Sequence, residues 1–437
     1  MNAAPVKVGL IGLGTVGQGV VRLLKDNAEA IAARLGRPLV VTVASARDLT
    51  RPRDCNLAGI RLTDRAEDVV NADDVDLVCE LIGGSEPALS LVSTALARGR
   101  PVVTANKALL ALHGNTVFER ARAAGVAVGF EAAVAGGIPV IKAIREGLAG
   151  NRIEQVAGII NGTGNYILTQ MRDQGQSFAD ALADAQRLGY AEADPTFDIE
   201  GVDAAHKLTI LASIAFGMPL AFAQVSVQGI TAVSAEDIRT AEALGYRIKH
   251  LGIAKRTEGQ VELRVHPTLV PEQQLLAKVD GVLNAVLIHG NGSGPIGLYG
   301  AGAGGNATAS AVVADLVDLA RGLGRSGGAA VPDLGFLPEA LRGLPVRPLA
   351  DTESAFYLRL RVADEPGVLK GITSIFAELD VSIEAIQQRE PRESEDATVA
   401  LITSEAPERL IHEAVQRIEA LPFVREQLSR IRVEHFA

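Results

Sequence analysis

The stretch VKVGLIGLGTVGQGV, residues 6–20, decides the fold of the N-terminal part of the chain. A short apolar run ends at Gly12, and Gly12, Gly14 and Gly17 then form a G-x-G-x-x-G pattern directly before a helical segment. The first glycine allows a tight turn, the second lets a pyrophosphate approach the backbone, and the third allows close packing of helix on strand. Backbone N–H groups at the helix start, from Thr15 and Val16 onward, favour an anion. The pattern therefore predicts a dinucleotide site, with a plain glycine-rich turn as the alternative in a chain of 45 glycines.

Strand-like and helix-like segments alternate outward from this loop over the first 140 or so residues. Because the strands are continuous apolar runs, they indicate a parallel sheet covered on both faces. We expect a doubly wound Rossmann domain over residues 1–145, completed by a returning helix at about 303–325. The further strand candidates are PLVVTVAS (38–45), VDLVCELIG (75–83), RPVVTAN (100–106) and GVAVGFEAAV (125–134).

The end of the second strand candidate bears on the choice of dinucleotide. NAD-selective folds usually place an acid there to bind the ribose 2′-hydroxyl. Here the strand ends in Ala44-Ser45-Ala46, and the first charge is Arg47, with Arg51 and Arg53 behind it. A guanidinium pairs well with a 2′-phosphate. The sequence favours NADP(H), with NAD(H) still possible because Asp48 follows closely.

The remaining chain reads as two further domains and a linker. Residues 146–302 predict an α+β catalytic and dimerisation domain, with strands at AFAQVSVQGI (221–230), RIKHLGIAKRT (247–257), QVELRVHPTLV (260–270) and AVLIHGN (285–291). Residues 326–350 are rich in proline and glycine, as linkers are. Residues 351–437 follow a βαββαβ order, which predicts a ferredoxin-like module.

Composition excludes several classes of protein. The 437 residues are 48% hydrophobic and 22% charged, as expected of a globular chain of several domains. A net charge of −10 and the lack of tryptophan argue against nucleic-acid binding. Two cysteines and an N-terminus without a signal-peptide pattern predict a cytoplasmic setting. Residues 208–235 carry no Asp, Glu, Lys or Arg, but Gly217-Met218-Pro219 interrupts them, so we expect a buried helix and a strand instead of a membrane span.

The densest group of acids is in GYAEADPTFDIEGVDAAHK, residues 189–207. On a helix, Asp203 and Lys207 share one face, and that face continues through Ile210 and Ile214. The charged pair thus heads an apolar stripe, where lysine and aspartate are seldom found without a reason. Asp198 has two open interpretations, a helix N-cap or a functional group.

Two other charged residues have competing interpretations. Lys107 follows a strand-like segment, at the end where α/β sheets bind ligands, but it also fits a lysine in the first turn of a helix. His206 points away from the Asp203–Lys207 face and is interpreted as structural. The histidines show no metal-ligand spacing, so a zinc site is not expected.

These motifs resemble one known family. The pattern from Ala185 to Lys207 is similar to the signature of homoserine dehydrogenases. The flanking motifs GIINGTGNYIL (158–168) and TANKALLA (104–111) are similar to motifs of the same family, and the resemblance extends over essentially the whole chain. The signature is Ala185-x₃-Gly189-Tyr190-Ala191-x₂-Asp194-Pro195-x₂-Asp198-Ile199-x-Gly201-x-Asp203-x₃-Lys207. The resemblance implies reversible NAD(P)H-dependent reduction of aspartate 4-semialdehyde to homoserine, on the route to threonine, methionine and isoleucine. No aspartokinase-like segment precedes the glycine loop, so the monofunctional form is expected.

The resemblance also implies roles for individual residues. Lys207 would be the general acid/base, Asp203 and Glu192 would hold the substrate with support from Asp198, and Lys107 would lie near substrate and nicotinamide. The residues implied at the cofactor, besides the glycine loop and Arg47, are Thr104, Lys107, Gly189, Glu192, Gly302 and Gly304.

Further partners follow from the resemblance alone. A monovalent cation such as Na⁺ would be held by Glu131 and by backbone carbonyls of Val134, Gly136 and Ile138. DEPGVL (364–369) is similar to the turn of ACT modules, small amino-acid sensors, and implies threonine as an effector. A homodimer or homotetramer is expected.

Two rival functions remain open at this point. One is a non-catalytic, amino-acid-responsive regulator on a Rossmann scaffold, which would have no use for a buried lysine. The other is an amino-acid dehydrogenase that acts on the amine of aspartate. Consumption of NADPH with aspartate semialdehyde, or with oxaloacetate and ammonia, distinguishes all three.

Overall fold

The computed structural model describes residues 4–324, 331–389 and 396–436. Contacts divide the chain into two compact units. Unit 1 comprises Met1–Val156, Ala205–Val225 and Leu283–Leu344, and unit 2 comprises Ala157–Ala204, Ser226–Val282 and Pro345–Ala437. The domain limits predicted above stay a prediction, and residues 325–330, next to and within the predicted linker, lie outside the described residues.

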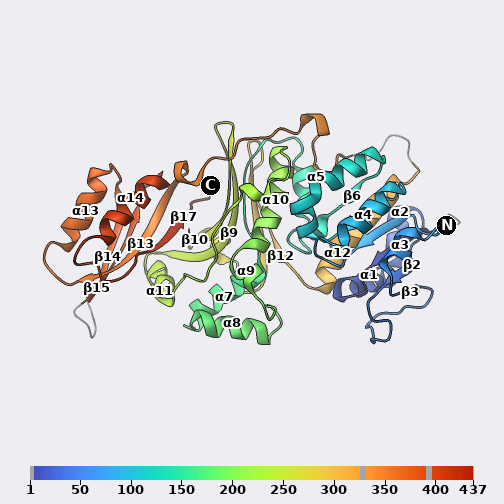
Figure 1. Ribbon diagram of the computed structural model, residues 1–437, viewed down its shortest axis with the longest axis horizontal. Coiled ribbons are helices and arrows are strands. Elements are labelled where there is room, and N and C mark those ends of the chain that lie inside the picture. Colours follow the sequence, from blue (N-terminus) through green and yellow to red (C-terminus); the bar gives the residue numbers. More distant parts are fainter. Residues whose placement is uncertain (1–3, 325–330, 390–395, 437) are drawn as a thin grey trace. The chain divides into compact units, whose positions relative to one another are not determined.

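A parallel sheet in the order β3-β2-β1-β4-β5-β6 forms the centre of unit 1 (Figure 1). The doubly wound sheet predicted from the sequence is therefore confirmed. The strand order reverses between β1 and β4, and such sheets bind ligands beyond the carboxyl ends of the strands at this point. The strands are β1 (Val6–Ile11), β2 (Leu39–Ser45), β3 (Arg61–Thr63), β4 (Leu77–Glu80), β5 (Val102–Thr104) and β6 (Val128–Gly129). The short β3 was not predicted, because Leu62 is its one apolar residue.

Helices flank this sheet. The long helical segment after the glycine loop is interrupted at Asn27, which ends α1 and begins α2. Helix α12 packs on α1, because a Cβ added at Gly19 would lie 2.9 Å from the Cβ of Ala309. The helices are α1 (Thr15–Asp26), α2 (Ala28–Leu35), α3 (Ala66–Asn71), α4 (Ala88–Ala97), α5 (Lys107–Ala123) and α12 (Gly305–Gly322).

The second part of unit 1 contains a hairpin and short helical segments. Strands β11 and β12 pair antiparallel from Leu283↔Ala301 to Gly290↔Gly294. The bounds are β11 (Leu283–Gly290), β12 (Gly294–Ala301), η1 (Glu131–Ala133), α6 (Val140–Lys142), η2 (Ala143–Gly147), η3 (Phe222–Gln224) and η5 (Pro338–Ala340).

Helix α10 (Val202–Phe216) has its first residues in unit 2 and the rest in unit 1, and β7 (Ile153–Ile159) likewise starts in unit 1 and ends in unit 2. Gly217 follows the last residue of α10, and its positive φ of 67° ends the helix. Within the described ranges, every helix is too short or too polar to cross a membrane. The prediction of a buried helix within residues 208–235 is confirmed. The strand expected at 221–230 is reduced to β8 (Ser226–Val227), because a 3₁₀ turn occupies Phe222–Gln224.

In unit 2 a long antiparallel hairpin joins the C-terminal module in one sheet, in the order β9-β10-β17-β13-β15-β14 (Figure 1). Strand β10 pairs in parallel with β17 at Thr268↔Arg432 and Leu269↔Val433. The strands are β9 (Tyr246–Thr257), β10 (Gln260–Pro271), β13 (Glu353–Ala363), β14 (Ile383–Arg389), β15 (Asp396–Thr403), β16 (Ala406–Pro407) and β17 (Ser429–Val433). The helices are α7 (Gly162–Asp173), α8 (Phe178–Arg187), α9 (Thr196–Ile199), α11 (Ala235–Ala243), η4 (Leu276–Lys278), η6 (Leu349–Asp351), α13 (Val368–Glu378) and α14 (Glu408–Glu419).

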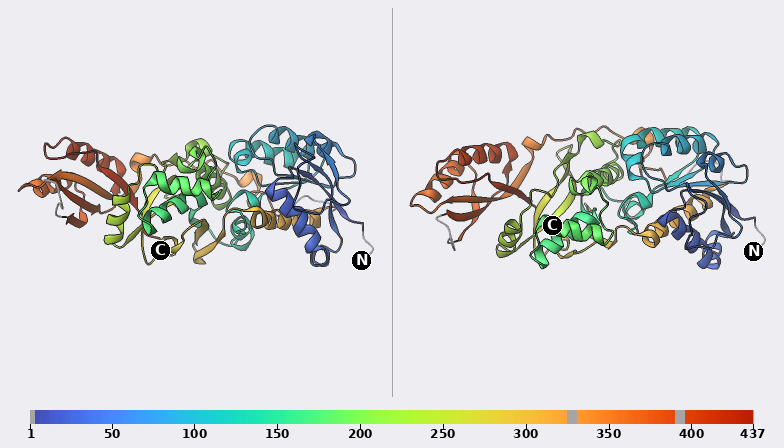
Figure 2. Two further views of the ribbon diagram at one scale, coloured as in Figure 1. Left: turned by 90° about the horizontal axis from the view of Figure 1, so that it is seen from below. Right: turned by 60° about the horizontal axis from the view of Figure 1, so that its bottom comes forward.

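The C-terminal module has the predicted βαββαβ order. Helices α13 and α14 cover one face of its sheet (Figure 2), where Phe356, Leu358 and Ile372 are buried in one cluster. On the opposite face, Tyr357 and Ile402 belong to a cluster with residues of α7 and α11. The part of the opposite face around Tyr357 and Ile402 is therefore covered as well.

Candidate active site

The glycine loop has the backbone geometry of an anion cradle. Gly12 adopts a φ of 99°, which favours glycine, and a Cβ added at Gly17 would lie 2.2 Å from the carbonyl oxygen of Gly12. Among the residues that the structure describes, nothing lies within 4 Å of a Cβ added at Gly14, the N-cap of α1, and no side chain caps this helix. The helix begins with Thr15 and Val16. The open approach at Gly14 and the uncapped N–H groups fit a pyrophosphate.

A second helix begins beside the first. Gly304 is the N-cap of α12 and has a φ of 107°. A Cβ added there would meet no described atom within 4 Å. A Cβ added at Gly305 would lie 2.8 Å from Cγ2 of Thr15, so the first turns of α12 and α1 touch. Gly302 is tightly packed, because an added Cβ would lie 2.0 Å from the side chain of Asn284. Packing therefore explains a glycine at 302, whereas Gly304 offers open backbone near the cradle.

The loop after β2 bears on the choice between NAD and NADP. The Oδ1 of Asp48 accepts hydrogen bonds from the backbone N–H of Thr50 (2.8 Å) and Arg51 (3.2 Å) and from the Thr50 hydroxyl. The hydrogen bonds of Thr50 lower the pKa of this carboxyl. Arg53 donates to the carbonyl oxygen of Asp48, while Arg47 is exposed. Asp48 and Arg53 thus brace their own loop, while Arg47 and Arg51 are both exposed to solvent.

The carboxyl ends of β4 and β5 are joined by a buried acid that the sequence analysis missed. Glu80 is fully buried and accepts hydrogen bonds from the Thr104 hydroxyl (2.6 Å) and from the N–H of Ile82 and Gly83. The Thr104 oxygen in turn accepts from the Asn106 N–H at 3.0 Å. The signal was present, since LVCE (77–80) ends a buried strand in an acid. Thr104 therefore has a bracing role, and its predicted cofactor contact stays a prediction.

This network fixes the start of α5. Asn106 is its N-cap, accepting from the N–H of Leu109 at 3.0 Å and donating to the carbonyl oxygen of Gly84 at 2.7 Å. Lys107 is the first residue of the helix and is half-buried. A cation there opposes the helix dipole, so helix stability does not explain the lysine. That favours a functional role over the alternative of an ordinary first-turn lysine.

In unit 2, the acids Asp198 and Asp203 are held together by one amide. Asn161 Nδ2 donates to Asp198 Oδ1 at 2.7 Å and to Asp203 Oδ2 at 2.8 Å. Asp203 is 3% exposed and Asn161 4%. The N-cap interpretation of Asp198 is wrong, because this residue lies inside α9, whose N-cap is Pro195. Asn161 was missed as a site residue because its partners are 37 and 42 positions away.

Helix α10 carries Asp203 in its first turn and Lys207 one turn later. Asp203 is buried and Lys207 is half-buried. Residues four apart on a helix lie on one face, as the sequence analysis expected.

The remaining predicted residues of unit 2 lie in a turn after α8. Gly189 adopts a φ of 76° and is exposed. Glu192 is exposed, and its carbonyl oxygen accepts a hydrogen bond from Gln186 at 3.1 Å. Neither is brought by the structure into the hydrogen-bonded acid pair.

Glu131, the predicted cation ligand, is buried in unit 1. Its two carboxylate oxygens accept from the N–H of Ile141 (2.8 Å) and Lys142 (2.9 Å). Burial, and next the charge of Asp315, raise the pKa of Glu131 to about 7. A buried carboxylate whose charge is disfavoured gains from a positive partner, so its chemistry fits a cation.

The predicted carbonyl ligands lie in a turn with unusual backbone. Ala135 and Gly136 both have a φ of 54°, and positive φ at an alanine marks a constrained loop. Val134 and Ile138 are buried, and the Ile138 carbonyl oxygen already accepts from the N–H of Val140 at 2.8 Å. No cluster of three metal-ligating side chains exists within the described ranges, so any cation here would depend on these carbonyls.

A doubly wound sheet whose first loop is an anion cradle, followed by a helix carrying a buried acid and a lysine, defines a nicotinamide-dependent dehydrogenase. Residues 12–131 match the NAD-binding domain of homoserine dehydrogenase, residues 139–317 match the homoserine dehydrogenase family, and residues 356–423 match the ACT domain. The chain belongs to the homoserine dehydrogenase family, whose members are NAD(P)-dependent oxidoreductases acting on a CH–OH group.

Relatives and solved structures agree. A homoserine dehydrogenase from Pseudomonas aeruginosa is 53% identical over 432 residues, covering 98% of this chain and 99% of that protein. The crystal structure of a homoserine dehydrogenase from Thiobacillus denitrificans is 52% identical with a TM-score of 0.94, covering 99% of each chain. A hyperthermophilic archaeal homoserine dehydrogenase in complex with NADPH has a TM-score of 0.59 at 25% identity, covering 75% of this chain and 100% of that one.

Proposed function

We propose that the protein catalyses the reversible NADP(H)-dependent reduction of L-aspartate 4-semialdehyde to L-homoserine, with Lys207 as the general acid/base. The observation that carries this assignment is helix α10, on which Lys207 follows the buried, hydrogen-bonded Asp203 by one turn. When bound, NADPH supplies hydride to the aldehyde carbon. Lys207 then stabilises the negative charge on the substrate oxygen and protonates it.

Substrate binding is assigned to the carboxylates. Homoserine carries an ammonium group, and a carboxylate is its natural partner. Asp203 and Glu192 fill this role, with Asp198 in support, while Lys107 lies near substrate and nicotinamide. The burial of Asp203 supports its part, because a buried carboxylate interacts strongly with a cation.

The reaction is tested by following NADPH absorbance. We expect oxidation of NADPH with aspartate semialdehyde and none with oxaloacetate plus ammonia. Turnover with the second pair alone would assign the protein to the amine dehydrogenases, and turnover with neither would favour a non-catalytic regulator.

Preference for NADP(H) is proposed from the loop after β2, and the NADPH complex of the archaeal relative supports it. Arg47→Ala should lower the ratio of kcat/KM for NADPH over NADH by about 10-fold or more, because a charge-assisted hydrogen bond to the 2′-phosphate contributes about 1.5–3 kcal/mol. The matched control is Arg51→Ala, which removes the same charge from the same loop. An unchanged ratio in Arg47→Ala, or equal shifts in both variants, would refute the pairing.

Threonine is proposed as the effector of the ACT module. Its first strand and α13 are joined at Gly367, which has a φ of 99° and open space at its Cα. Threonine should lower the initial rate and raise the unfolding temperature of the full chain, since a ligand that binds the folded state stabilises it. Equal effects from other neutral amino acids, or none from threonine, would contradict the assignment.

A monovalent cation at Glu131 is also proposed. Na⁺ would be held by Glu131 and by carbonyl oxygens of Val134, Gly136 and Ile138. Activity should then rise with NaCl but not with choline chloride at equal ionic strength, and Glu131→Gln should remove the difference.

A homodimer or homotetramer is proposed as well. Light scattering that gives the mass of the monomer would exclude both.

A further inference from the structure

Asn161 makes three hydrogen bonds with one side chain. Its Oδ1 accepts from the N–H of Gly164 at 2.7 Å, which caps α7. Its Nδ2 donates one hydrogen toward Asp198 and the other toward Asp203. A planar amide with all three directions used has one orientation, so it fixes the two carboxylates relative to each other.

The cap alone does not require an asparagine. An N-cap uses only the side-chain oxygen, and serine serves as well as asparagine. What serine lacks is the pair of N–H donors. Both donors go to acids that belong to the substrate assignment above, so capping does not account for the amide group.

The bridge also holds two carboxyl groups close to each other, because both accept hydrogen bonds from the same nitrogen. His250 lies near Asp203, and burial lowers the pKa of its imidazole to about 4, so this ring carries no positive charge at pH 7.

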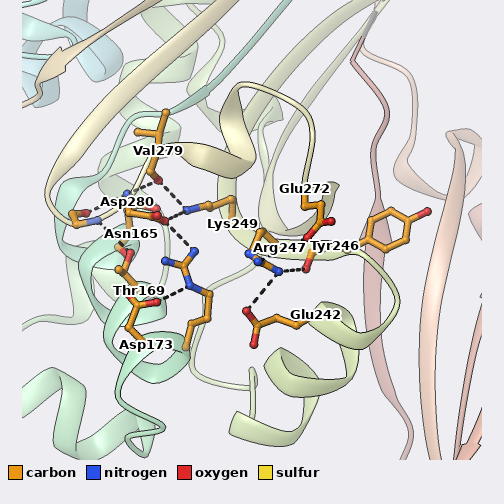
Figure 3. Close-up of polar contacts among 12 residues, drawn as sticks. Asn165, Thr169, Asp173, Glu242, Tyr246, Arg247, Lys249, Glu272, Val279 and Asp280 are labelled. Carbon is orange, nitrogen blue, oxygen red and sulfur yellow. Dashed lines mark hydrogen bonds and ion pairs between the residues drawn. The ribbon is translucent and has the colours of Figure 1, made fainter.

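Asn161 stands on a firmly held helix. Further along α7, Asn165 donates to the carbonyl oxygens of Val279 and Gly281, and Arg172 pairs with Asp280 at 2.9 Å. The buried Lys249 donates to the carbonyl oxygen of Val279 and to the carboxylate of Asp280, at 2.7 Å each (Figure 3). The loop that follows η4 is thus fastened to α7 by Asn165 and Arg172 and to β9 by Lys249.

We propose that Asn161 is a positioning residue that aligns the carboxylates of Asp198 and Asp203 to receive the substrate's ammonium group. The proposal rests on the proposed function, because the ammonium belongs to homoserine or aspartate semialdehyde. Asn161 acts through the two acids and itself touches neither substrate nor cofactor.

The test is Asn161→Ser, which keeps an oxygen for the cap and removes the bridge. We expect the KM for homoserine to rise about 10- to 100-fold, as for the loss of hydrogen bonds to charged groups, with the KM for NADP⁺ unchanged within about 2-fold. The matched control is Ser177→Ala, which removes the cap of the neighbouring helix α8, where Ser177 accepts from the Asp180 N–H. It should lower the midpoint of urea unfolding and leave both KM values unchanged.

A double-mutant cycle keeps the proposal falsifiable if Asn161→Ser is poorly stable. Asp198→Ala removes one acceptor of the bridge. The KM for homoserine of the double variant should therefore rise by less than the product of the two single fold-changes. Multiplicative losses, an unchanged homoserine KM in Asn161→Ser, or equal changes in the homoserine and NADP⁺ constants would each overturn the proposal. Lack of homoserine turnover by the unmodified chain would instead overturn the proposed function.

Discussion

Lys207→Ala is expected to lower kcat for homoserine oxidation by about 10²- to 10⁴-fold, the range that general acid–base catalysis contributes. Lys207 lies one turn after Asp203 on α10, and under the proposed mechanism it is the group that exchanges a proton with the substrate oxygen. The glycine loop is separate from α10 in sequence, so NADPH binding should persist. The measurements are steady-state kcat and NADPH affinity of the variant.

Lys207→Arg separates charge from proton transfer. Arginine keeps the positive charge but is never deprotonated in proteins, so it stabilises an oxyanion without serving as a base. We expect the arginine variant to remain as impaired as the alanine variant in the oxidative direction. Full activity in either variant would remove Lys207 from the mechanism.

Arg359→Ala should destabilise the protein by about 3–5 kcal/mol, because it leaves a buried carboxylate without its partner. Arg359 lies on β13 and donates to Asp237 of α11 at 2.7 Å, and the Asp237 side chain is fully buried. Burial by itself raises the pKa of Asp237, but the hydrogen bond and charge of Arg359, together with hydrogen bonds from Ser234 and Ser429, outweigh it, and the net pKa is lowered. Unfolding by urea at pH 7 measures the loss.

The matched control is Arg361→Ala on the same strand. The Arg361 side chain is 45% exposed and lies 3.8 Å from Asp396, so its removal should cost less than about 1 kcal/mol. The pH dependence has a definite sign. A carboxyl whose pKa is lowered by folding stabilises the folded state above its unfolded-state pKa of about 4. This stabilisation is lost as the pH falls through the lower folded-state pKa. The difference in unfolding free energy between Arg359→Ala and the unmodified chain should therefore narrow in acid. Equal losses in the two variants would show that the ion pair has no special role.

The contacts between the C-terminal module and α11 also determine how the effect of threonine is tested. Removing the C-terminal module would take away Arg359, Tyr357 and Ile402, and would thereby uncover Asp237 and the apolar residues of α7 and α11 that pack against the module. A truncated chain would therefore lose stability and response together. Experiments on threonine belong with the full chain.

The sequence predicted the elements that depend on local pattern. Apolar runs and glycine spacing gave the Rossmann sheet and the βαββαβ module, and the break at Gly217 marked the end of α10. The errors have local causes too: β3 has a single apolar residue, and the apolar 221–230 contains a 3₁₀ turn. Asp198 looked like a cap because acids precede helices, yet it lies within α9.

The candidate site was predictable in its glycine loop and in the charged residues of its motifs. The partners of Glu80 and Asn161 were not predictable, because their hydrogen bonds join positions 24 to 42 apart and no local pattern reveals such partners. Carbonyl oxygens, such as those proposed around Glu131, have no residue-type signal at all.

The pairing of β17 with β10 has a consequence for synthesis on the ribosome. Thr268 and Leu269 of β10 pair with Arg432 and Val433, which are translated much later than β10. That stretch of β10 must wait for its neighbour until β17 has been made, and an open strand edge is prone to mispairing. A nascent chain that stalls before β17 would therefore present this edge to chaperones or to other chains.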